Sequence, residues 1–493
     1  MIVPQLRHAI PLLLIAGTLV AREARAQYVR ISGASWAQSI DLRPLREDSI
    51  SAAGVPGEGI YRTTASGQVV RCLEGATVCR FFTSGERASA APLTHDVAVA
   101  AWGLGRGVSF HSQGRFRSSL GGARELWPRQ GDRFDLIDAY LAIDRGRYGA
   151  RLGRLWSTNA LGAYNFDGGA LTFRRWGGSL EAFGGRALVQ GLNEGYASGE
   201  IGAVDDIPPE EEGYLIGVRL RARPTPVSAL SVLYQRVVRG DRAGLYSERA
   251  AFDASTRLGR ATLDATLAYD IATNSVNDAR LRGARALFGA FNGALEVRRH
   301  RPFFELWTIW GAFAPVGFDE GRANLTWRGA GDRLLIDAHG AYRTYAEANT
   351  GAGFLPLRSN GWRAGTGATW LPSEHFSASA SYDADIGFGS SRSAGSAGVR
   401  WTRGDGTHLG ASGSAFQTIY EFRVGNGRVL GAALDAGLRL TSELRVAADA
   451  GIYRHRLSDG APGTDWSQRR ASLRLEWAVG ADPGVASGRG GVR

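Results

Sequence analysis

The sequence predicts an all-β chain that closes into an antiparallel, up-and-down transmembrane β-barrel of about 22 strands, with roughly 18 to 24 as the range. Two observations support this fold: long segments in which apolar and polar residues alternate, and a succession of very short turns and longer links. Alternation with a period of two places apolar side chains on one face of a strand and polar side chains on the other. Among β-sheets, only one that closes on itself satisfies every backbone hydrogen bond in lipid.

The clearest strands lie near the C-terminal end, at 428–440, 444–452 and 470–479. In the first of them Leu434 lies on the apolar face, whereas Asp435 and Arg439 lie on the polar face. Strands of roughly 10 to 13 residues are longer than the usual length of about 5 or 6 and suit a tilted crossing of a bilayer. These segments therefore favour a membrane barrel over a soluble β-sandwich.

The connections between strands alternate in length along the chain. Very short turns are expected at 103–107, 144–147, 176–178, 224–227, 258–260, 289–292, 329–332, 371–374, 404–406 and 441–443. Longer links are expected at 120–133, 158–168, 191–212, 240–245, 271–278, 302–318, 347–360, 389–392, 420–427 and 457–467. Short periplasmic turns and longer external loops are typical of outer-membrane barrels. Placing both termini in the periplasm then gives an even number of strands, which is least certain at 278–300 and 403–428.

The two ends of the chain are expected to lie outside the barrel. Residues 1–26 have the polar start, apolar core and Ala24-Arg25-Ala26 site of a secretory signal peptide. The barrel is expected to occupy 27–480, and residues 481–493 form a Gly-rich, flexible tail. Beyond the signal no apolar run of 18 residues occurs, so no transmembrane helix is expected.

Residues 43–92 lose the alternation and are expected to form a long loop with a small hairpin of its own. The loop contains both cysteines, Cys72 and Cys79, in the segment CLEGATVC. A disulfide is the expected state in an exported chain, with two free thiols or a metal site as the alternatives. A disulfide in so short a loop stiffens it without holding the fold together.

The chain is basic, with 58 Lys and Arg residues against 47 Asp and Glu residues and a net charge of +11. The arginines are spread singly along the polar faces of strands, and this pattern does not predict a nucleic-acid-binding face. It suits the wall of a water-filled lumen better. One denser run, 298–301, is a candidate for binding lipopolysaccharide phosphates or solute anions, or for snorkelling at the membrane interface.

No pattern in the sequence predicts an enzyme. None of the eight histidines lies in a recognisable nucleophile motif, and no H-E-x-x-H occurs. We therefore expect no catalytic residue, no metal site and no cofactor.

Two segments resemble known outer-membrane proteins. The segment GRLWSTNALGAYNFDGGALTFRR, from Gly153 to Arg175, is similar to the strand, loop and strand of porin-like and alginate-export-like barrels. Leu473, Leu475 and Trp477 resemble the C-terminal assembly signal of Gram-negative outer-membrane proteins, although a tail follows here. The resemblance implies a conduit in the cell outer membrane, with lipid, lipopolysaccharide and the barrel-assembly machinery as partners.

The function expected from these features is an outer-membrane channel for diffusion or export of small polar solutes, with anionic solutes as one candidate class. The alternative is a plugged barrel that supports extracellular loops. A barrel of this size needs an obstruction in its lumen, for which 43–92 and 302–318 are the candidate segments. The residues expected to face the lumen are Arg147, Arg151, Arg219, Arg221, Arg322, Arg328, Arg333, Asp337, His339, Asp435, Arg439, Arg445, Asp449 and Arg474.

Overall fold

The computed structural model describes residues 27–42, 45–57, 61–64, 69–72, 75–84, 88–120, 134–188, 213–239, 245–301, 317–345, 359–387, 391–419, 427–457 and 466–481. Almost all regular structure in these ranges is β-strand, apart from a short 3-10 helix at Ala52–Gly54. In this part of the chain no helix has the length and apolar character needed to cross a membrane. The signal peptide and the tail expected from the sequence lie outside the described residues.

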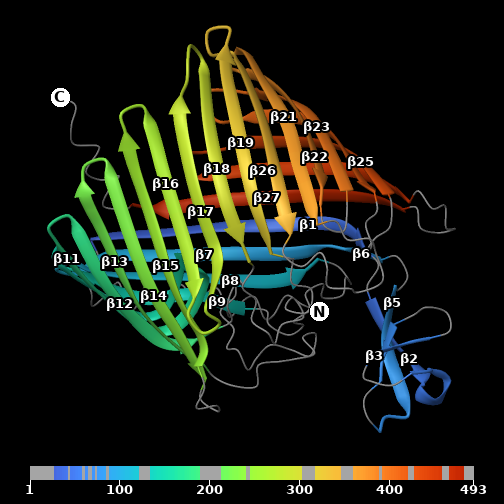
Figure 1. Cartoon of the computed structure of the whole chain (residues 1–493), viewed down its shortest axis with the longest axis horizontal. Coiled ribbons are helices and arrows are strands. Elements are labelled where there is room, and N and C mark those ends of the chain that lie inside the picture. Colours follow the sequence, from blue (N-terminus) through green and yellow to red (C-terminus); the bar gives the residue numbers. More distant parts are fainter. Residues whose placement is uncertain are drawn as a thin grey trace.

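Most of the strands form one closed antiparallel wall (Figure 1). The wall strands are β1 (Tyr28–Leu42), β6 (Ala88–Ala90), β7 (Pro92–Gly105), β8 (Val108–Ser119), β9 (Phe134–Asp144), β10 (Tyr148–Asn159), β11 (Gly162–Arg175), β12 (Gly178–Ala187), β13 (Gly213–Thr225), β14 (Ser228–Arg239), β15 (Leu245–Leu258), β16 (Ala261–Asp270), β17 (Ser275–Ala286), β18 (Phe291–His300), β19 (Phe318–Gly329), β20 (Leu334–Tyr345), β21 (Asn360–Ser373), β22 (Phe376–Ile386), β23 (Ser391–Thr402), β24 (His408–Ile419), β25 (Gly427–Arg439), β26 (Leu444–Leu457) and β27 (Trp466–Gly480).

Closure follows from the pairing of β1, which joins β27 on one side and β7 on the other. Only Ala91 separates β6 from β7, and both strands pair with β1. Counting these two as one, the 23 strands of the sheet form a 22-stranded barrel. The fold class and the strand number expected from the sequence are therefore confirmed.

The short turns expected from the sequence all separate paired strands, and the two uncertain segments, 278–300 and 403–428, contain strands of the wall. Pairing of Arg30 with Gly480 places the start of β1 and the end of β27 at the short-turn end. The opposite end is called the long-link end below. Most of the links expected there fall wholly or largely outside the described residues: 120–133, 191–212, 240–245, 302–318, 347–360, 389–392, 420–427 and 457–467.

The predictions of two longer links, at 158–168 and 271–278, are wrong. At 158–168 the chain forms continuous strands joined by a turn at 160–161, because this hairpin is buried on both faces and loses the alternation of a lipid-facing strand. At 271–278 the link is limited to 271–274. There β17 begins at Ser275 and carries a register shift, so its polar residues belong to a strand.

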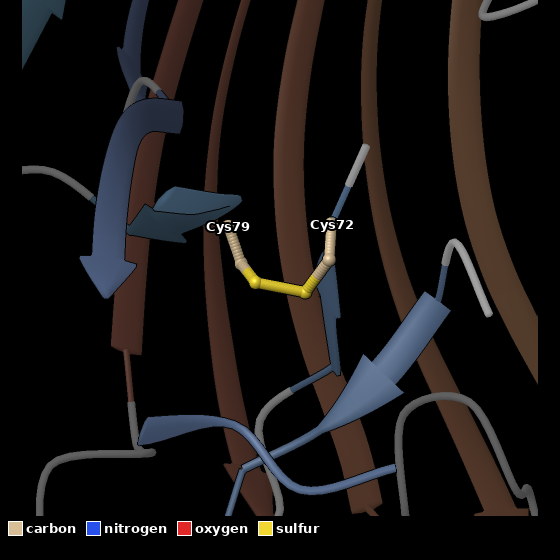
Figure 2. Close-up of a disulfide and its surroundings, with 2 residues drawn as sticks. All are labelled: Cys72 and Cys79. Atoms are coloured by element: carbon tan, nitrogen blue, oxygen red, sulfur yellow. A yellow bond between two sulfur atoms is a disulfide. The ribbon is translucent and has the colours of Figure 1, made fainter. Parts of the chain in front are cut away.

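A small second sheet lies beyond the long-link end of β1 (Figure 1). Its strands are β2 (Leu45–Ser51), β5 (Val78–Ser84), β4 (Val69–Arg71) and β3 (Tyr61–Thr63), paired in that order. Cys72 and Cys79 are joined by a disulfide with their Cα atoms 4.2 Å apart, as expected from the sequence (Figure 2). Val55 and Val70 pack with the disulfide in a small core. The described part of 45–84 is thus a disulfide-linked sheet outside the wall, and it does not obstruct the lumen. The loop expected at 43–92 is too long at its C-terminal end, because 88–90 and Pro92 belong to the wall strands β6 and β7.

Candidate functional site in the barrel interior

The inward face of the wall is identified by one large hollow that runs across consecutive strands. It has a volume of about 1180 Å³ and is lined by residues of each strand from β11 to β18, including Arg221, Asp253 and Arg282. A hollow that continues over so many strands of a closed wall lies on its concave side. Directly paired residues of antiparallel strands point to the same side, so the register extends this assignment around the barrel.

The other face of the wall carries exposed apolar side chains. Leu152, Ile216 and Leu434 alternate with the inward residues of their strands, and Leu434 is 61% exposed. Large apolar side chains exposed in this number are typical of a surface that contacts lipid. The wall is therefore apolar on its outer face and polar where it lines the hollow.

The end of the β10–β11 pair leaves the wall and is called the inner hairpin (residues 153–168). Pairing of β10 with β9 ends at Arg154, and pairing of β11 with β12 ends at Phe166. Gly153 adopts a φ of +136°, and a Cβ atom there would lie 2.2 Å from the carbonyl oxygen of Ala139. Only glycine accommodates both the backbone conformation and this close approach.

The inner hairpin packs against the inward face of the neighbouring strands. Its apolar side chains form a buried cluster with residues of β12 to β16: Leu155, Leu161, Tyr164, Phe166, Ala170, Phe183, Leu215, Leu233, Val237, Ala251 and Ala268. Phe166 and Phe183 contact each other with their ring centroids 5.9 Å apart. Each large side chain buried in this way stabilises the hairpin by about 1.5–3 kcal/mol.

A buried arginine on β15 holds the tip of the inner hairpin. Arg249 is 4% exposed and donates a hydrogen bond of 3.0 Å to the carbonyl oxygen of Leu161. It also donates to the hydroxyl of Tyr164, which itself donates to the same carbonyl. Three strands, β12 to β14, separate β15 from β11 in the sheet, so these contacts require the hairpin to fold across the inside of the wall.

The opposite face of the inner hairpin is bonded to β9. Arg154 forms an ion pair of 2.7 Å with Asp167 and donates to the carbonyl oxygen of Leu136 at 3.1 Å. The side-chain amide of Asn165 donates to the carbonyl oxygen of Ile137 at 2.9 Å. The hairpin is thus fixed on both faces and narrows the lumen at this sector.

In the register of the wall, the strand residues predicted to face the lumen share one face with the residues that line the hollow, and their role as a pore wall stays a prediction. These are Arg151, Arg219, Arg221, Arg322, Arg328, Asp337, His339, Asp435, Arg439, Arg445, Asp449 and Arg474. Arg147 and Arg333 lie in turns at the short-turn end. The alternation of polar and apolar positions therefore predicts the shared face of the strand residues, whereas it does not apply to the two turn residues.

Two of the assigned arginines meet beside the inner hairpin. Arg151 on β10 and Arg219 on β13 both contact Glu181 of β12, at 3.0 Å and 3.6 Å. Arg219 is 7% exposed and also donates to the hydroxyl of Ser157 on the hairpin, at 3.4 Å. Glu181 was missed from the sequence, although it alternates with Leu180 and Ala182 as an inward residue should.

Other assigned residues lie in separate pairs on the far side of the barrel. Asp435 accepts from Arg400 at 2.8 Å and lies 3.4 Å from His408. His339 lies 3.2 Å from Asp383. The assigned residues therefore do not form a single cluster, and those on strands lie on β10, β13, β19, β20 and β25 to β27.

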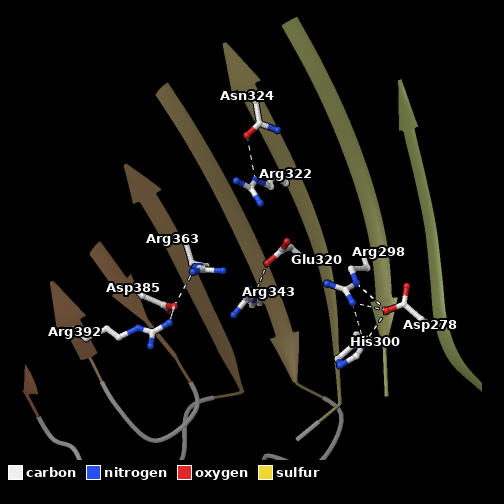
Figure 3. A network of polar contacts seen from close by, with 10 residues as sticks. All are labelled: Asp278, Arg298, His300, Glu320, Arg322, Asn324, Arg343, Arg363, Asp385 and Arg392. Carbon is white, nitrogen blue, oxygen red and sulfur yellow. Dashed lines mark hydrogen bonds and ion pairs between the residues drawn. The ribbon is translucent and has the colours of Figure 1, made fainter. Parts of the chain in front are cut away.

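A further set of inward charges lies near the long-link end of β17 to β23 (Figure 3). Asp278 accepts from Arg298 and from His300, the latter at 2.8 Å, and Arg343 pairs with Glu320. In the same set of charges, Asp385 forms ion pairs with Arg363 at 3.0 Å and with Arg392 at 3.2 Å. Alternation along the chain does not reveal this set, because the flanking links conceal where each strand begins.

The basic run 298–301 is divided between the two faces of the wall. Arg298 points inward to Asp278, whereas Arg299 points outward and pairs with Asp319 at 2.7 Å. Neighbouring positions of a strand face opposite sides, so the run cannot act as one basic cluster.

Several inward arginines of the large hollow have no carboxylate directly opposite them. Arg221 stands between Ser179 and Ser231 of the adjacent strands, and Arg280 stands between Thr266 and Arg298. Both line the hollow next to Arg223. A guanidinium group without a protein carboxylate is available to bind an anionic solute.

Among the residues that the structure describes, no group of three or more His, Cys, Asp or Glu side chains is arranged to hold a metal ion. The interior is accordingly described by its arginines, carboxylates and inner hairpin.

Comparisons with known proteins give remote similarity. No protein-family model matches the sequence, and no curated protein matches it. Solved structures that align with it include OprD of Pseudomonas aeruginosa, with 8% identity, a TM-score of 0.40 and coverage of 93% of this chain and 96% of that chain. OccAB4 of Acinetobacter baumannii aligns with 8% identity, a TM-score of 0.41 and coverage of 92% and 98%. A BenF-like porin from Pseudomonas fluorescens Pf-5 aligns with 9% identity, a TM-score of 0.39 and coverage of 91% and 99%. The fold described above rests on the strand pairing of the chain itself.

Proposed function

We propose that this protein is a channel in the outer membrane of a Gram-negative bacterium and that it passes small polar, preferentially anionic, solutes. The observation that supports the proposal is the closed 22-stranded wall, apolar outside, with inward arginines such as Arg221 and Arg280 that face no carboxylate. A closed barrel with an apolar outer band suits a bilayer, and bacterial barrels of this kind occupy the outer membrane.

Transport in this proposal is passive diffusion along the inward arginines. A carboxylate or phosphate of the solute binds a guanidinium fork in the hollow of β11 to β18, and neighbouring arginines such as Arg223 offer the next site. Conduction requires several weak sites of this kind, because one strong site would retain the solute. The carboxylates Asp253 and Asp264 in the same hollow moderate the positive potential.

The inner hairpin supplies the selective narrowing in this proposal. It covers the inward face of β12 to β16 at the long-link end and leaves Arg151 and Arg219 beside its base. A solute that passes the hairpin therefore meets a partly buried positive site. Of the constrictions expected from the sequence, 302–316 lies outside the described residues.

Ion selectivity in planar bilayers tests the proposal. The double variant Arg221→Gln, Arg280→Gln removes two inward charges, whereas Arg285→Gln removes an exposed outward charge on the same strand as Arg280. We expect the anion-to-cation permeability ratio to fall severalfold in the double variant and to remain unchanged in Arg285→Gln. Equal selectivity of all three proteins would contradict the role of the inward arginines.

A barrel that supports extracellular loops is the second candidate, and the small disulfide-linked sheet beyond the long-link end favours it. The two candidates differ in conductance. A folded, heat-modifiable barrel that carries no ion current in bilayers would favour the supporting role and exclude the channel.

We also propose that the barrel-assembly machinery recognises β27. Leu473, Leu475 and Trp477 alternate with the inward residues Arg474 and Glu476 and so lie on the outward face. Apolar side chains on the lipid-facing side of the last strand support this assignment.

A further inference from the structure

Four arginines gather on the outward face of three adjacent strands near the long-link end of the wall. Arg428 of β25 pairs directly with Arg456 of β26, and Arg454 lies two residues from Arg456 on the same face. Arg469 of β27 pairs with Ile452, which is the next outward residue along β26. Arg428, Arg454 and Arg469 are exposed, and Arg456 is half-buried.

This arginine cluster lies at the edge of the apolar outer band. Arg454 pairs directly with Leu430, and Leu434 and Leu438 continue the outward face of β25 toward the short-turn end. Leu430, Leu434 and Leu438 are all about half exposed or more. The guanidinium groups therefore stand where acyl chains end and lipid headgroups begin.

The cluster differs from other outward arginines near the long-link end. Arg299 forms an ion pair with Asp319, and Arg236 pairs in register with Glu248. Among the side chains that the structure describes, no Asp or Glu faces the four arginines of β25 to β27. Like charges placed directly opposite each other on neighbouring strands are destabilising, so an anion bound between Arg428 and Arg456 would stabilise this face.

We propose that the outward face of β25 to β27 binds the phosphate groups of a phosphorylated glycolipid in the outer leaflet of the membrane. The bound lipid places its phosphates between Arg428, Arg454, Arg456 and Arg469, and its acyl chains lie along Leu430 and Leu434. Guanidinium forks bind phosphate through paired, charge-assisted hydrogen bonds. This inference depends on the membrane location and does not depend on what passes through the lumen.

Binding of a defined glycolipid to the purified full-length barrel in detergent tests the proposal. The probe is a diphosphorylated acylated disaccharide, measured by native mass spectrometry against the same lipid without phosphate. We expect the double variant Arg428→Gln, Arg456→Gln to bind the diphosphorylated lipid about tenfold more weakly, and the matched control Arg299→Gln to bind it as the parent does. The lipid without phosphate should bind weakly to all three.

Three results would overturn the proposal. The first is undiminished binding by the double variant, and the second is equal binding of the lipid that lacks phosphate. The third is displacement of the lipid by millimolar inorganic phosphate, which would assign the cluster to a free anion. If the double variant does not fold, as judged by heat-modifiable gel mobility, Arg454→Gln alone is used. Bilayer conductance of these variants should match the parent, so failure here is distinguishable from failure of the channel proposal.

Discussion

Two sectors of the barrel have the same backbone pairing and opposite interiors. Inside β10 to β16 the inner hairpin covers the wall with a buried apolar cluster, and Arg249 is 4% exposed. Inside β19 to β24 the wall carries ion pairs that stay in contact with water, with the Arg392 side chain 52% exposed. The interior chemistry of such a barrel is therefore determined by what lies over the wall as well as by the wall itself.

The largest expected loss of stability is in the covered sector, which is the part of the wall from β10 to β16 that lies under the inner hairpin. Phe166→Ala removes a ring that is 1% exposed at the centre of the apolar cluster and should destabilise the barrel by about 3–5 kcal/mol. Phe416→Ala makes the same change on the inward face of β24, where the ring is 40% exposed, and should cost below about 1 kcal/mol. Denaturant unfolding of both variants measures the difference.

The same pair of variants also reports on the narrowing. Release of the inner hairpin by Phe166→Ala should raise the single-channel conductance, and Phe416→Ala should leave it unchanged. Equal stability and equal conductance of the two variants would show that the hairpin does not close this sector.

An intermediate effect is expected at the bend of the inner hairpin. Gly153→Ala forces a Cβ atom into an unfavourable φ and against the carbonyl oxygen of Ala139, at a cost of roughly 1–3 kcal/mol. Gly283→Ala is the control, because a Cβ atom on β17 would meet nothing within 4 Å. Protease susceptibility of the folded barrel should rise at 153–168 in the first variant only. Identical proteolysis of both would place the bend elsewhere.

The smallest loss of stability is expected in the uncovered sector, which is the part of the wall from β19 to β24. Arg363→Gln breaks the 3.0 Å ion pair with Asp385, but Arg392 still contacts that carboxylate. The Arg363 side chain is 37% exposed, so the loss should stay below about 1 kcal/mol and shrink further in high salt. If Arg363→Gln lost as much stability as Phe166→Ala, the ion pairs of β19 to β24 would stabilise the barrel as strongly as the apolar cluster does.

Alternation identified the wall strands because each strand divides lipid from water. It located the turns at the short-turn end and placed Arg219, Asp435 and Arg474 on the inward face. The same rule failed at 158–168, where Leu155 and Phe166 face one part of the protein and Asn165 faces another. With no lipid on either side, the pattern of a strand resembles that of a loop.

The residues that anchor the inner hairpin could not be found from the sequence. Arg249 has the alternation of any inward arginine, and its burial depends on Leu161 and Tyr164 of the inner hairpin. Three strands, β12 to β14, separate β15 from this hairpin in the sheet. The same holds for Glu181, whose ion pairs with Arg151 and Arg219 form only because the barrel brings β10, β12 and β13 together beside the inner hairpin. Such contacts depend on how the barrel curves, and local periodicity does not contain that information.

The sequence by itself determined the all-β membrane-barrel class, a strand number of about 22 within the range 18 to 24, a disulfide as the expected state of the two cysteines, and the alternation of polar and apolar positions along the strands. These properties follow from chemistry that repeats locally: period-two alternation, turn residues and paired cysteines. The tertiary structure alone decided that the β10–β11 hairpin folds inward, that Arg249 is buried, and that Arg428, Arg454, Arg456 and Arg469 meet on one outward surface. Closure and register bring these groups together across the sheet, and such encounters leave no periodic signal along the chain.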